Sequence, residues 1–168
     1  MSTVLPDVSD EKALRQAFAH FPCGVAALAA RVDGIDQVLI VASFSVGISL
    51  SPPLVSFAVQ RSSTTWPLLR AAQTLGVSVL STGQDYLCRQ LASKDRNIRW
   101  AGVDAERSGT GAILICNAAL SFECAIHAEY PAGDHDIVLL EVKSFCTEPH
   151  IEPLVFHGSR FRTLEASA

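Results

Sequence analysis

The alternation of apolar and polar positions along the chain predicts a mainly β protein with a few helices. Between residues 120 and 130, apolar side chains occupy every second position, which is typical of a half-buried antiparallel strand. A Pro-Ala-Gly-Asp turn at residues 131–134 leads into a second long strand at residues 137–145. Residues 154–164 close the chain as a short hairpin. Shorter apolar runs predict further strands at residues 24–31, 37–42, 54–59 and 75–80.

Capping residues and helical spacing predict helices beside these strands. Asp10 can cap a helix that carries Phe18 on its apolar face. Pro67 suits the first turn of a second, short helix, because that position needs no backbone N–H. Residues 84–93 predict a third helix, and residues 94–111 are expected to be the longest irregular stretch. Strands joined by short hairpins favour a closed or Greek-key β-barrel with the helices outside.

The size and composition of the chain predict one domain with a covered apolar surface. We expect its 168 residues to fold as a single unit with a core over residues 14–164 and loose ends at residues 1–9 and 165–168. The composition is 49% apolar and only 18% charged, which leaves too little charge to cover the whole surface. Part of that surface is therefore expected to face a second subunit or a cofactor.

The charge pattern argues against two kinds of partner. A formal net charge of −4 without a Lys/Arg run argues against nucleic acid. No apolar stretch has membrane-spanning length, which argues against a membrane. The first residues lack the basic start and apolar core of a secretory signal, so we expect a cytoplasmic protein.

The five cysteines are expected to be buried, reduced thiols. Their number is odd and no CxxC pair occurs, which argues against a disulfide framework. Cys124 and His127 are three positions apart on a predicted strand, so they point to opposite faces and cannot bind one metal ion. His127 and Glu129 share the polar face of that strand, where solvated side chains are expected. We therefore predict no metal site.

Residues 43–65 are the most informative stretch of the chain. A hydroxyl-rich, nearly uncharged segment leads into Pro52 and Pro53, a short apolar strand follows, and a second hydroxyl cluster stands beside Arg61. Such residues are also ordinary in loops. As a ligand site, the stretch offers neutral hydrogen bonds and one positive charge, which suits a planar ligand with a phosphate tail. The chain lacks the dinucleotide fingerprint, Walker loop and GxSxG motif of other chemistries.

These loops suit a flavin nucleotide. The polar edge of its isoalloxazine ring is expected at Ala42, Ser43, Ser45 and Ser49, and Phe44 is expected to cover the apolar part of the ring. This part of the prediction depends on serine hydroxyls and backbone groups that are free to bind a ligand.

The phosphate end of the ligand is predicted at the second hydroxyl cluster. Arg61 adds a positive charge there, and unpaired N–H groups at a helix start attract anions. Thr64 or Thr65 can cap that helix. The predicted set is Arg61, Ser62, Ser63, Thr64 and Thr65. Lys94 either approaches the phosphate from the other side or is an ordinary solvated lysine at a helix end.

Several short motifs resemble those of one known family in order and in separation. They are Phe21-Pro22-Cys23-Gly24-Val25, Ser43-Phe44, Ser49-Leu50-Ser51-Pro52-Pro53-Leu54-Val55, Trp100-Ala101-Gly102-Val103, Gly133-Asp134-His135 and Phe156-His157-Gly158-Ser159-Arg160-Phe161. Together they resemble the flavin reductase-like family, with its FMN-binding split-barrel fold, over residues 14–164.

The resemblance implies a homodimer in which each flavin, FMN or FAD, lies in a groove at the subunit interface. It also implies NADH or NADPH as the electron donor, and a small reductase component that supplies reduced flavin to a partner monooxygenase. His135 matches a family histidine near the nicotinamide and the flavin, and is expected to position the nicotinamide or tune the flavin. His157 and Arg160 match the closing segment and are expected to touch the cofactor tail or the other subunit.

Bulky residues stand where the family usually has glycine. Leu39 lies in the strand before the Ser-rich segment, and Leu140 precedes Glu141, where it is expected to fill space near the cofactor. The Ser-rich segment is one residue longer than usual, which leaves open whether Phe44 or Ser45 occupies the family's aromatic position. Two alternatives stay open: a flavin-binding electron carrier without nicotinamide-dependent activity, and a dimer on this fold that binds another ligand.

Overall fold

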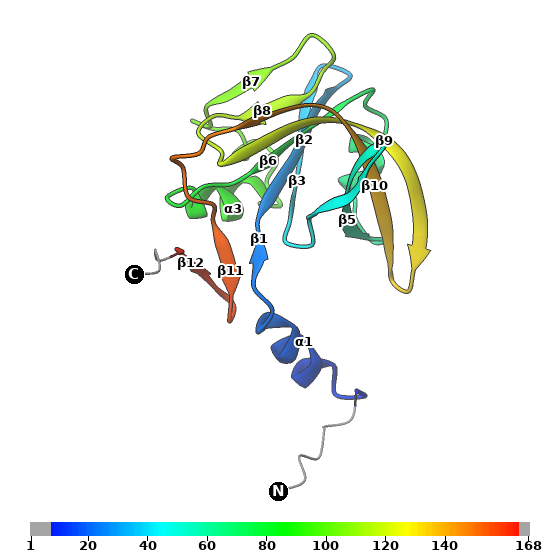
Figure 1. Cartoon of the computed structure of the whole chain (residues 1–168), viewed down its shortest axis with the longest axis vertical. Helices are drawn as coiled ribbons and strands as arrows, with labels where there is room; N and C mark the ends of the chain where they lie inside the picture. The colour runs from blue at the N-terminus through cyan, green and yellow to red at the C-terminus, as the bar shows by residue number, and fades with distance from the viewer. Residues whose placement is uncertain (1–7, 165–168) are drawn as a thin grey trace, which may run out of the picture.

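The computed structural model describes residues 8–164, a range in which the chain is mainly β (Figure 1). Most of the predicted loose ends, at residues 1–7 and 165–168, lie outside the described residues. The helices are α1 (Glu11–Ala19), α2 (Trp66–Leu69) and α3 (Asp85–Leu91). The strands are β1 (Cys23–Gly24), β2 (Ala26–Val32), β3 (Ile35–Val41), β4 (Ser45–Leu50), β5 (Pro53–Gln60), β6 (Leu75–Val79), β7 (Ala105–Arg107), β8 (Ile113–Ile115), β9 (Leu120–Ala132), β10 (His135–Thr147), β11 (Val155–His157) and β12 (Arg160–Arg162).

A seven-stranded antiparallel sheet, in the order β3-β2-β6-β9-β10-β5-β4, forms the body of the protein. Its longest part is the β9–β10 hairpin, which curves down one side of the molecule (Figure 1). Register shifts between Leu139 and Leu140 and between Val142 and Ser144 interrupt the ladder, and such bulges bend a strand pair. The two long antiparallel strands predicted from the alternation are confirmed.

The alternation predicts burial correctly along only part of β9. Phe122 and Cys124 are buried, as expected, but Tyr130 is 56% exposed. The physical reason is that β6 pairs with β9 only as far as Cys124, so the far end of the hairpin extends beyond the strands that would cover it.

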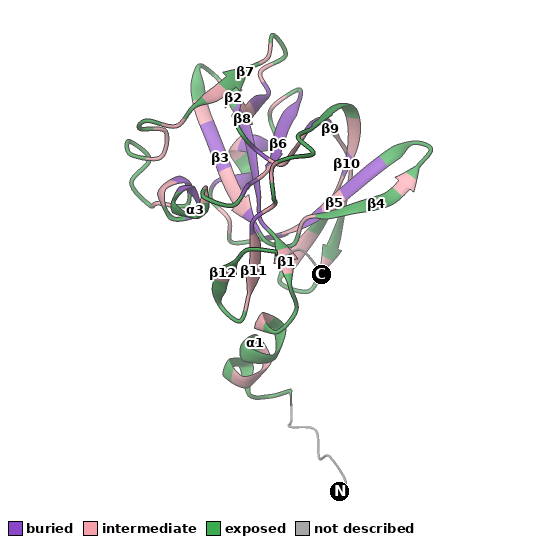
Figure 2. Ribbon diagram, turned by 60° about the vertical axis from the view of Figure 1, so that its left-hand side comes forward, coloured by how far each residue is buried: buried purple, intermediate pink, exposed green. Residues whose placement is uncertain are grey.

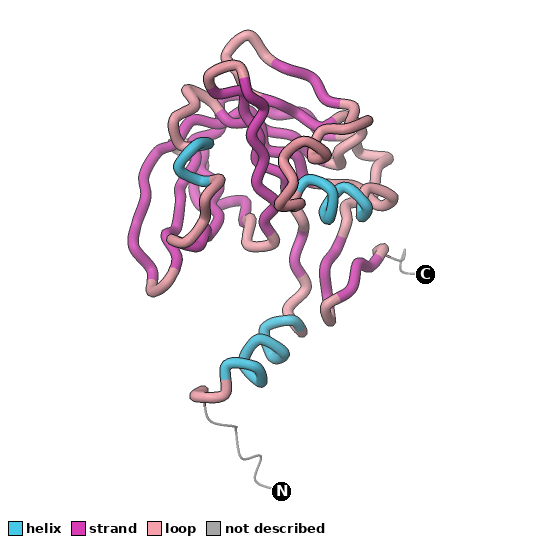
Figure 3. Tube along the Cα trace, turned by 180° about the vertical axis from the view of Figure 1, so that it is seen from behind, coloured by secondary structure: helices cyan, strands magenta, loops and turns pink. Residues whose placement is uncertain are grey.

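Strand β2 is buried on both faces and separates two hydrophobic clusters. Ala26 and Leu28 belong to one cluster, with Trp66 of α2, whereas Ala27 and Ala29 belong to the other, with side chains of α3. Seen from behind, α2 and α3 accordingly lie on opposite sides of this part of the sheet (Figure 3). The alanine-rich sequence of β2 suits this position, because small side chains let both layers pack closely on one strand.

Two segments expected to be irregular are strands. Residues 45–50 of the Ser-rich segment form β4, which pairs with β5 on either side of a register shift between Ser45 and Ser49. Apolar residues at every second position of β4 account for the strand, and its serines and glycine had suggested a loop. Residues 105–107 form β7, paired with β8, within the stretch expected to be irregular.

The expectation of a closed barrel is not met among the described strands, because β3 and β4 remain the edges of the large sheet. The chain after β3 nevertheless returns to the far end of the sheet. There Ser43 Oγ donates to the carbonyl oxygen of Ala58 on β5 and accepts from the N–H of Ala58, both at 3.0 Å. The Ser43 hydroxyl therefore makes both hydrogen bonds that the N–H and carbonyl groups of a neighbouring strand would otherwise make with Ala58.

Helix α1 extends away from the sheets and has no buried residue (Figure 2). Asp10 caps it as predicted, because its carboxylate accepts from the N–H of Ala13 at 3.0 Å. The small sheet β1-β11-β12 lies beside its end, and the N–H of Gly158 donates to the carbonyl oxygen of Ala19 at 2.7 Å. The exposed apolar face of α1 leaves Phe18 67% exposed.

All five cysteines are free, as predicted. Burial is right for Cys88 and Cys124 only, because Cys23 and Cys116 are half-buried and Cys146 is exposed. Within residues 8–164, no helix has the length and apolar character needed to cross a membrane.

Candidate functional site

A groove of about 830 Å³ lies where the end of α1, the end of β3, the α2 loop and the β9–β10 turn come together. Its volume is in the range of small-molecule sites. The groove is lined by Phe18, Phe21, Cys23, Leu39, Ile40, Val41, Ala42, Ser43, Ala58, Val59, Gln60, Ser62, Ser63, Thr64, Thr65 and His135. It therefore brings the start of the first predicted hydroxyl segment and the second hydroxyl cluster together with His135, the predicted catalytic residue.

The loop before α2 presents hydroxyl groups to this groove. Among the described residues, Ser62, Thr64 and Thr65 have no side-chain hydrogen bond to the protein. Thr65 occupies the N-cap position of α2, as one of the two predicted capping residues, but its side chain makes no capping hydrogen bond. Ser63 Oγ instead accepts from the N–H of Trp66 at 3.1 Å. Since α2 has only four residues, its dipole is small, and the hydroxyls and N–H groups of the loop are the main attraction for an anion.

Arg61 lies between two lining residues of the groove, Gln60 and Ser62, but does not itself line the groove, and its side chain is already paired. Its Nε donates to Oδ1 of Asp136 at 2.9 Å, and the side chain is 48% exposed. The sequence analysis found the arginine but not its carboxylate partner, which lies 75 positions away along the chain.

His135 lies at the start of β10, opposite Gln60 of β5 in the strand pairing. Its Nδ1 is 2.7 Å from Oδ1 of Asp134. This hydrogen bond, together with the charge of the imidazole when protonated, lowers the pKa of the Asp134 carboxyl. A ring anchored through Nδ1 keeps Nε2 for another partner.

Only some of the residues that were predicted to bind the isoalloxazine ring lie in the groove. Ala42 and Ser43 line the groove, but the Ser43 hydroxyl is engaged by Ala58. Ser45 and Ser49 lie on β4 and do not line this groove, and Ser49 Oγ accepts from the N–H of Ser51 at 3.3 Å.

Phe44 does not line the groove either. Its ring packs against the hydrophobic cluster that contains Leu28 and Trp66, and its centroid is 6.1 Å from that of Phe122. The other wall-forming side chains come from positions that the sequence analysis had treated as core or helix face. Leu39 is one of them, so the bulky replacement at this position does border the groove. Leu140 is fully buried in the core and does not, so its side chain fills no space there.

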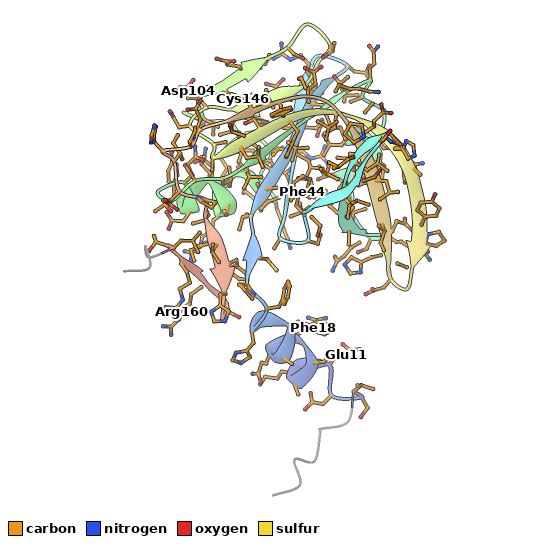
Figure 4. The ribbon with its side chains drawn as sticks, in the orientation of Figure 1. Glu11, Phe18, Phe44, Asp104, Cys146 and Arg160 are labelled. Carbon is orange, nitrogen blue, oxygen red and sulfur yellow. The ribbon has the colours of Figure 1, made fainter. Side chains whose placement is uncertain are left out.

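Three further predicted residues also lie outside the groove. Lys94 is exposed after α3, and His157 stacks edge-on with His20, their ring centroids 6.3 Å apart. Arg160 lies on the β11–β12 hairpin of the small sheet, away from the seven-stranded sheet (Figure 4). Within a single chain, these side chains do not contribute to the groove.

The side chains that line the groove are of the types that can bind a flavin. Apolar side chains from α1 and β3 form one part of the lining, and unpartnered hydroxyls form another beside an arginine. A flat ring system with a phosphate tail needs this combination of an apolar surface and anion donors. Among the described residues, no group of three or more His, Cys, Asp or Glu side chains could hold a metal ion.

Comparison with known proteins identifies the family. Residues 18–165 match the flavin reductase like domain, so the chain belongs to this family, as its short motifs indicated. The actinorhodin polyketide dimerase of Streptomyces coelicolor is 34% identical over 95% of this chain and 90% of its own length. The reductase component of 4-hydroxyphenylacetate 3-monooxygenase from Thermus thermophilus is 30% identical over 92% of this chain and 97% of its own length. The NADH:FAD oxidoreductase of Streptomyces globisporus, solved with NAD and FAD fragments, has a TM-score of 0.90 and 35% identity over 99% of each chain.

Proposed function

We propose that the protein is an NAD(P)H-dependent flavin reductase that binds FMN or FAD in the groove beside His135. The observation that carries this proposal is that one groove unites free hydroxyls, a neighbouring arginine and an anchored imidazole. Family membership and the similarity to an NADH:FAD oxidoreductase support it.

The residues of this chain would bind and orient the two nucleotides. A bound flavin supplies the electron chemistry, since it accepts a hydride from the reduced nicotinamide. The loop at residues 62–65, together with Arg61 directly before it in the chain, would hold the phosphate, and the apolar side chains of Phe21 and Leu39 would keep water from the ring. His135, anchored by Asp134 through Nδ1, positions the nicotinamide through Nε2.

A homodimer with the split-barrel arrangement is part of this proposal. Phe18, Phe21 and Leu50 are more than two-thirds exposed, and large apolar side chains seldom remain open to water in such numbers. A second copy that covers α1 and β4 would bury them and complete the wall of the groove. Light scattering coupled to size-exclusion chromatography tests this, because a mass near 18.0 kDa would contradict it.

The proposed reductase works as one domain in the cytoplasm and supplies reduced flavin to a partner monooxygenase. The similarity to the reductase component of a two-component monooxygenase supports such a partner. Pairing the purified protein with flavin-dependent monooxygenases encoded nearby tests this step, and product formation that depends on both proteins is the expected result.

The direct test of the function is flavin absorbance under anaerobic conditions. The protein is mixed with FMN or FAD, and then with NADH or NADPH, against a protein-free control. Rapid bleaching of the flavin is expected and identifies both nucleotides. Binding without bleaching would instead support a flavin-binding carrier. A failure to bind flavin would support a dimer with another ligand.

A further inference from the structure

Arg61 is held at two points by the segment that carries His135. Its backbone N–H donates to the carbonyl oxygen of Asp134 at 3.1 Å, and its side-chain Nε donates to Oδ1 of Asp136 at 2.9 Å. In the strand pairing, Asp136 lies opposite Val59 of β5. The end of β5 and the start of β10 are therefore fastened to each other through one arginine.

The geometry of the ion pair leaves part of the guanidinium for a ligand. Among the described residues, Nε is the one guanidinium nitrogen of Arg61 with a hydrogen bond, and the two terminal nitrogens have no hydrogen-bond partner. A guanidinium fixed through Nε still offers terminal N–H groups, and these bind a phosphate in a defined orientation. The neighbouring residue along the chain is Ser62, the first hydroxyl of the groove loop.

We propose that Asp136 is a positioning residue for the flavin phosphate, because it fixes the guanidinium of Arg61, the residue directly before the groove loop at residues 62–65. This inference rests on the proposed function, since it requires a phosphate-bearing flavin in the groove. It assigns a role to an acidic residue at a site for an anion, where acidic residues would otherwise be unfavourable.

Removal of Asp136 is expected to change the affinity for FMN in opposite directions under the two interpretations of this residue. If Asp136 only adds a negative charge near the site, its removal reduces repulsion and strengthens FMN binding. If Asp136 positions Arg61, its removal frees a long side chain and weakens the binding of phosphate. Riboflavin, which lacks the phosphate, is indifferent to both effects and reports on the rest of the groove.

The experiment measures dissociation constants for FMN and riboflavin by fluorescence quenching. The quantity of interest is the ratio of the riboflavin constant to the FMN constant, which expresses discrimination for the phosphate. In Asp136→Ala the ratio is expected to fall about tenfold, in line with the loss of one charged hydrogen bond, while riboflavin binding stays unchanged. Asp136→Asn, which keeps an acceptor for Nε, is expected to show a smaller fall and serves if the alanine variant does not fold.

Two further variants separate the possible causes. Glu129→Gln breaks a different ion pair on the same hairpin, with Arg70 at 3.4 Å, and is expected to leave the ratio unchanged. Arg61→Ala is expected to lower the ratio as Asp136→Ala does, and the double variant no further than Arg61→Ala alone.

The outcomes that overturn the inference differ from those that overturn the function. A ratio that rises or stays constant in Asp136→Ala, with a fall in Arg61→Ala, removes the role of Asp136 alone. An unchanged ratio in Arg61→Ala removes both residues from phosphate binding, while flavin reduction by the wild type would leave the proposed function intact. If the wild type neither binds nor reduces flavin, the proposed function fails first, and the inference fails with it.

Discussion

Gly76 of β6 lies against the main chain of Ile113 of β8, so that a Cβ on Gly76 would stand 2.0 Å from the carbonyl oxygen of Ile113. Both residues are buried, so the contact cannot open toward solvent. Glycine is required here by close packing, since the obstacle is backbone and not a flexible side chain.

Gly76→Ala is therefore expected to lower the free energy of unfolding by about 3 kcal/mol through overpacking. Chemical denaturation followed by circular dichroism measures this change. Gly109→Ala is the matched control, because a Cβ there meets nothing within 4 Å, and its effect should stay within about 0.5 kcal/mol. Equal effects of the two substitutions would contradict the packing argument.

Ser43→Ala tests the hydroxyl that joins the end of β3 to β5. The substitution removes the partner of both the N–H and the carbonyl oxygen of Ala58. It should lower the free energy of unfolding by about 1–2 kcal/mol, because two backbone groups lose a hydrogen bond. Ser45→Ala changes the same residue type on exposed β4 and should have little effect on denaturation. If the two serines behave alike, the Ser43 junction contributes no special stability.

His135→Ala is expected to slow flavin reduction about tenfold at saturating NADH, because the nicotinamide loses its positioning group. The dissociation constant for the flavin should change much less, and stopped-flow absorbance separates the two effects. Asp134→Asn removes the charged anchor of the imidazole and should give a smaller decrease in rate. His150→Ala, at an exposed turn, serves as the control. A full rate in His135→Ala would remove this residue from the mechanism.

Two buried thiols predict a loss of stability at alkaline pH. Burial raises the pKa of Cys124 from an ordinary value of 9.0 to about 12, and that of Cys88 to about 11. The neutral thiols are thus favoured in the folded state, so this contribution is intact below pH 9.0 and is lost as the pH rises toward 11. Denaturation between about pH 8 and pH 10 should show the decline. Cys88→Ala should reduce the decline, whereas Cys146→Ala, at an exposed position, should not.

Local chain chemistry was enough to predict most of the fold but less of the site. The β9–β10 hairpin could be predicted because apolar and polar residues alternate along β9, although burial follows this pattern only as far as Cys124. The start of α1 could be predicted because Asp10 is a capping residue. Strand β4 was missed because Ser and Gly are common in loops, although its apolar residues alternate.

The site was harder to predict because it is built from distant segments. The loop at residues 62–65 and His135 could be predicted from residue type and motif, and the groove contains both. The pairing of Arg61 with Asp136 depends on strand register, and the engagement of Ser43 by Ala58 depends on a tertiary contact. A sequence pattern indicates which groups are available, whereas the fold decides which of them are already occupied.

In the proposed dimer, helix α1 would make part of the groove depend on protein concentration. Phe18 of α1 and Phe21, two residues after the helix, line the groove, yet this nine-residue helix has no buried residue, and helices of this length are marginal alone in water. A partner that covers the apolar face of α1 would therefore also stabilise the part of the groove that Phe18 and Phe21 line. Association and ligand affinity would then be thermodynamically linked. Dilution should accordingly lower the activity per chain well before any strand of the large sheet unfolds.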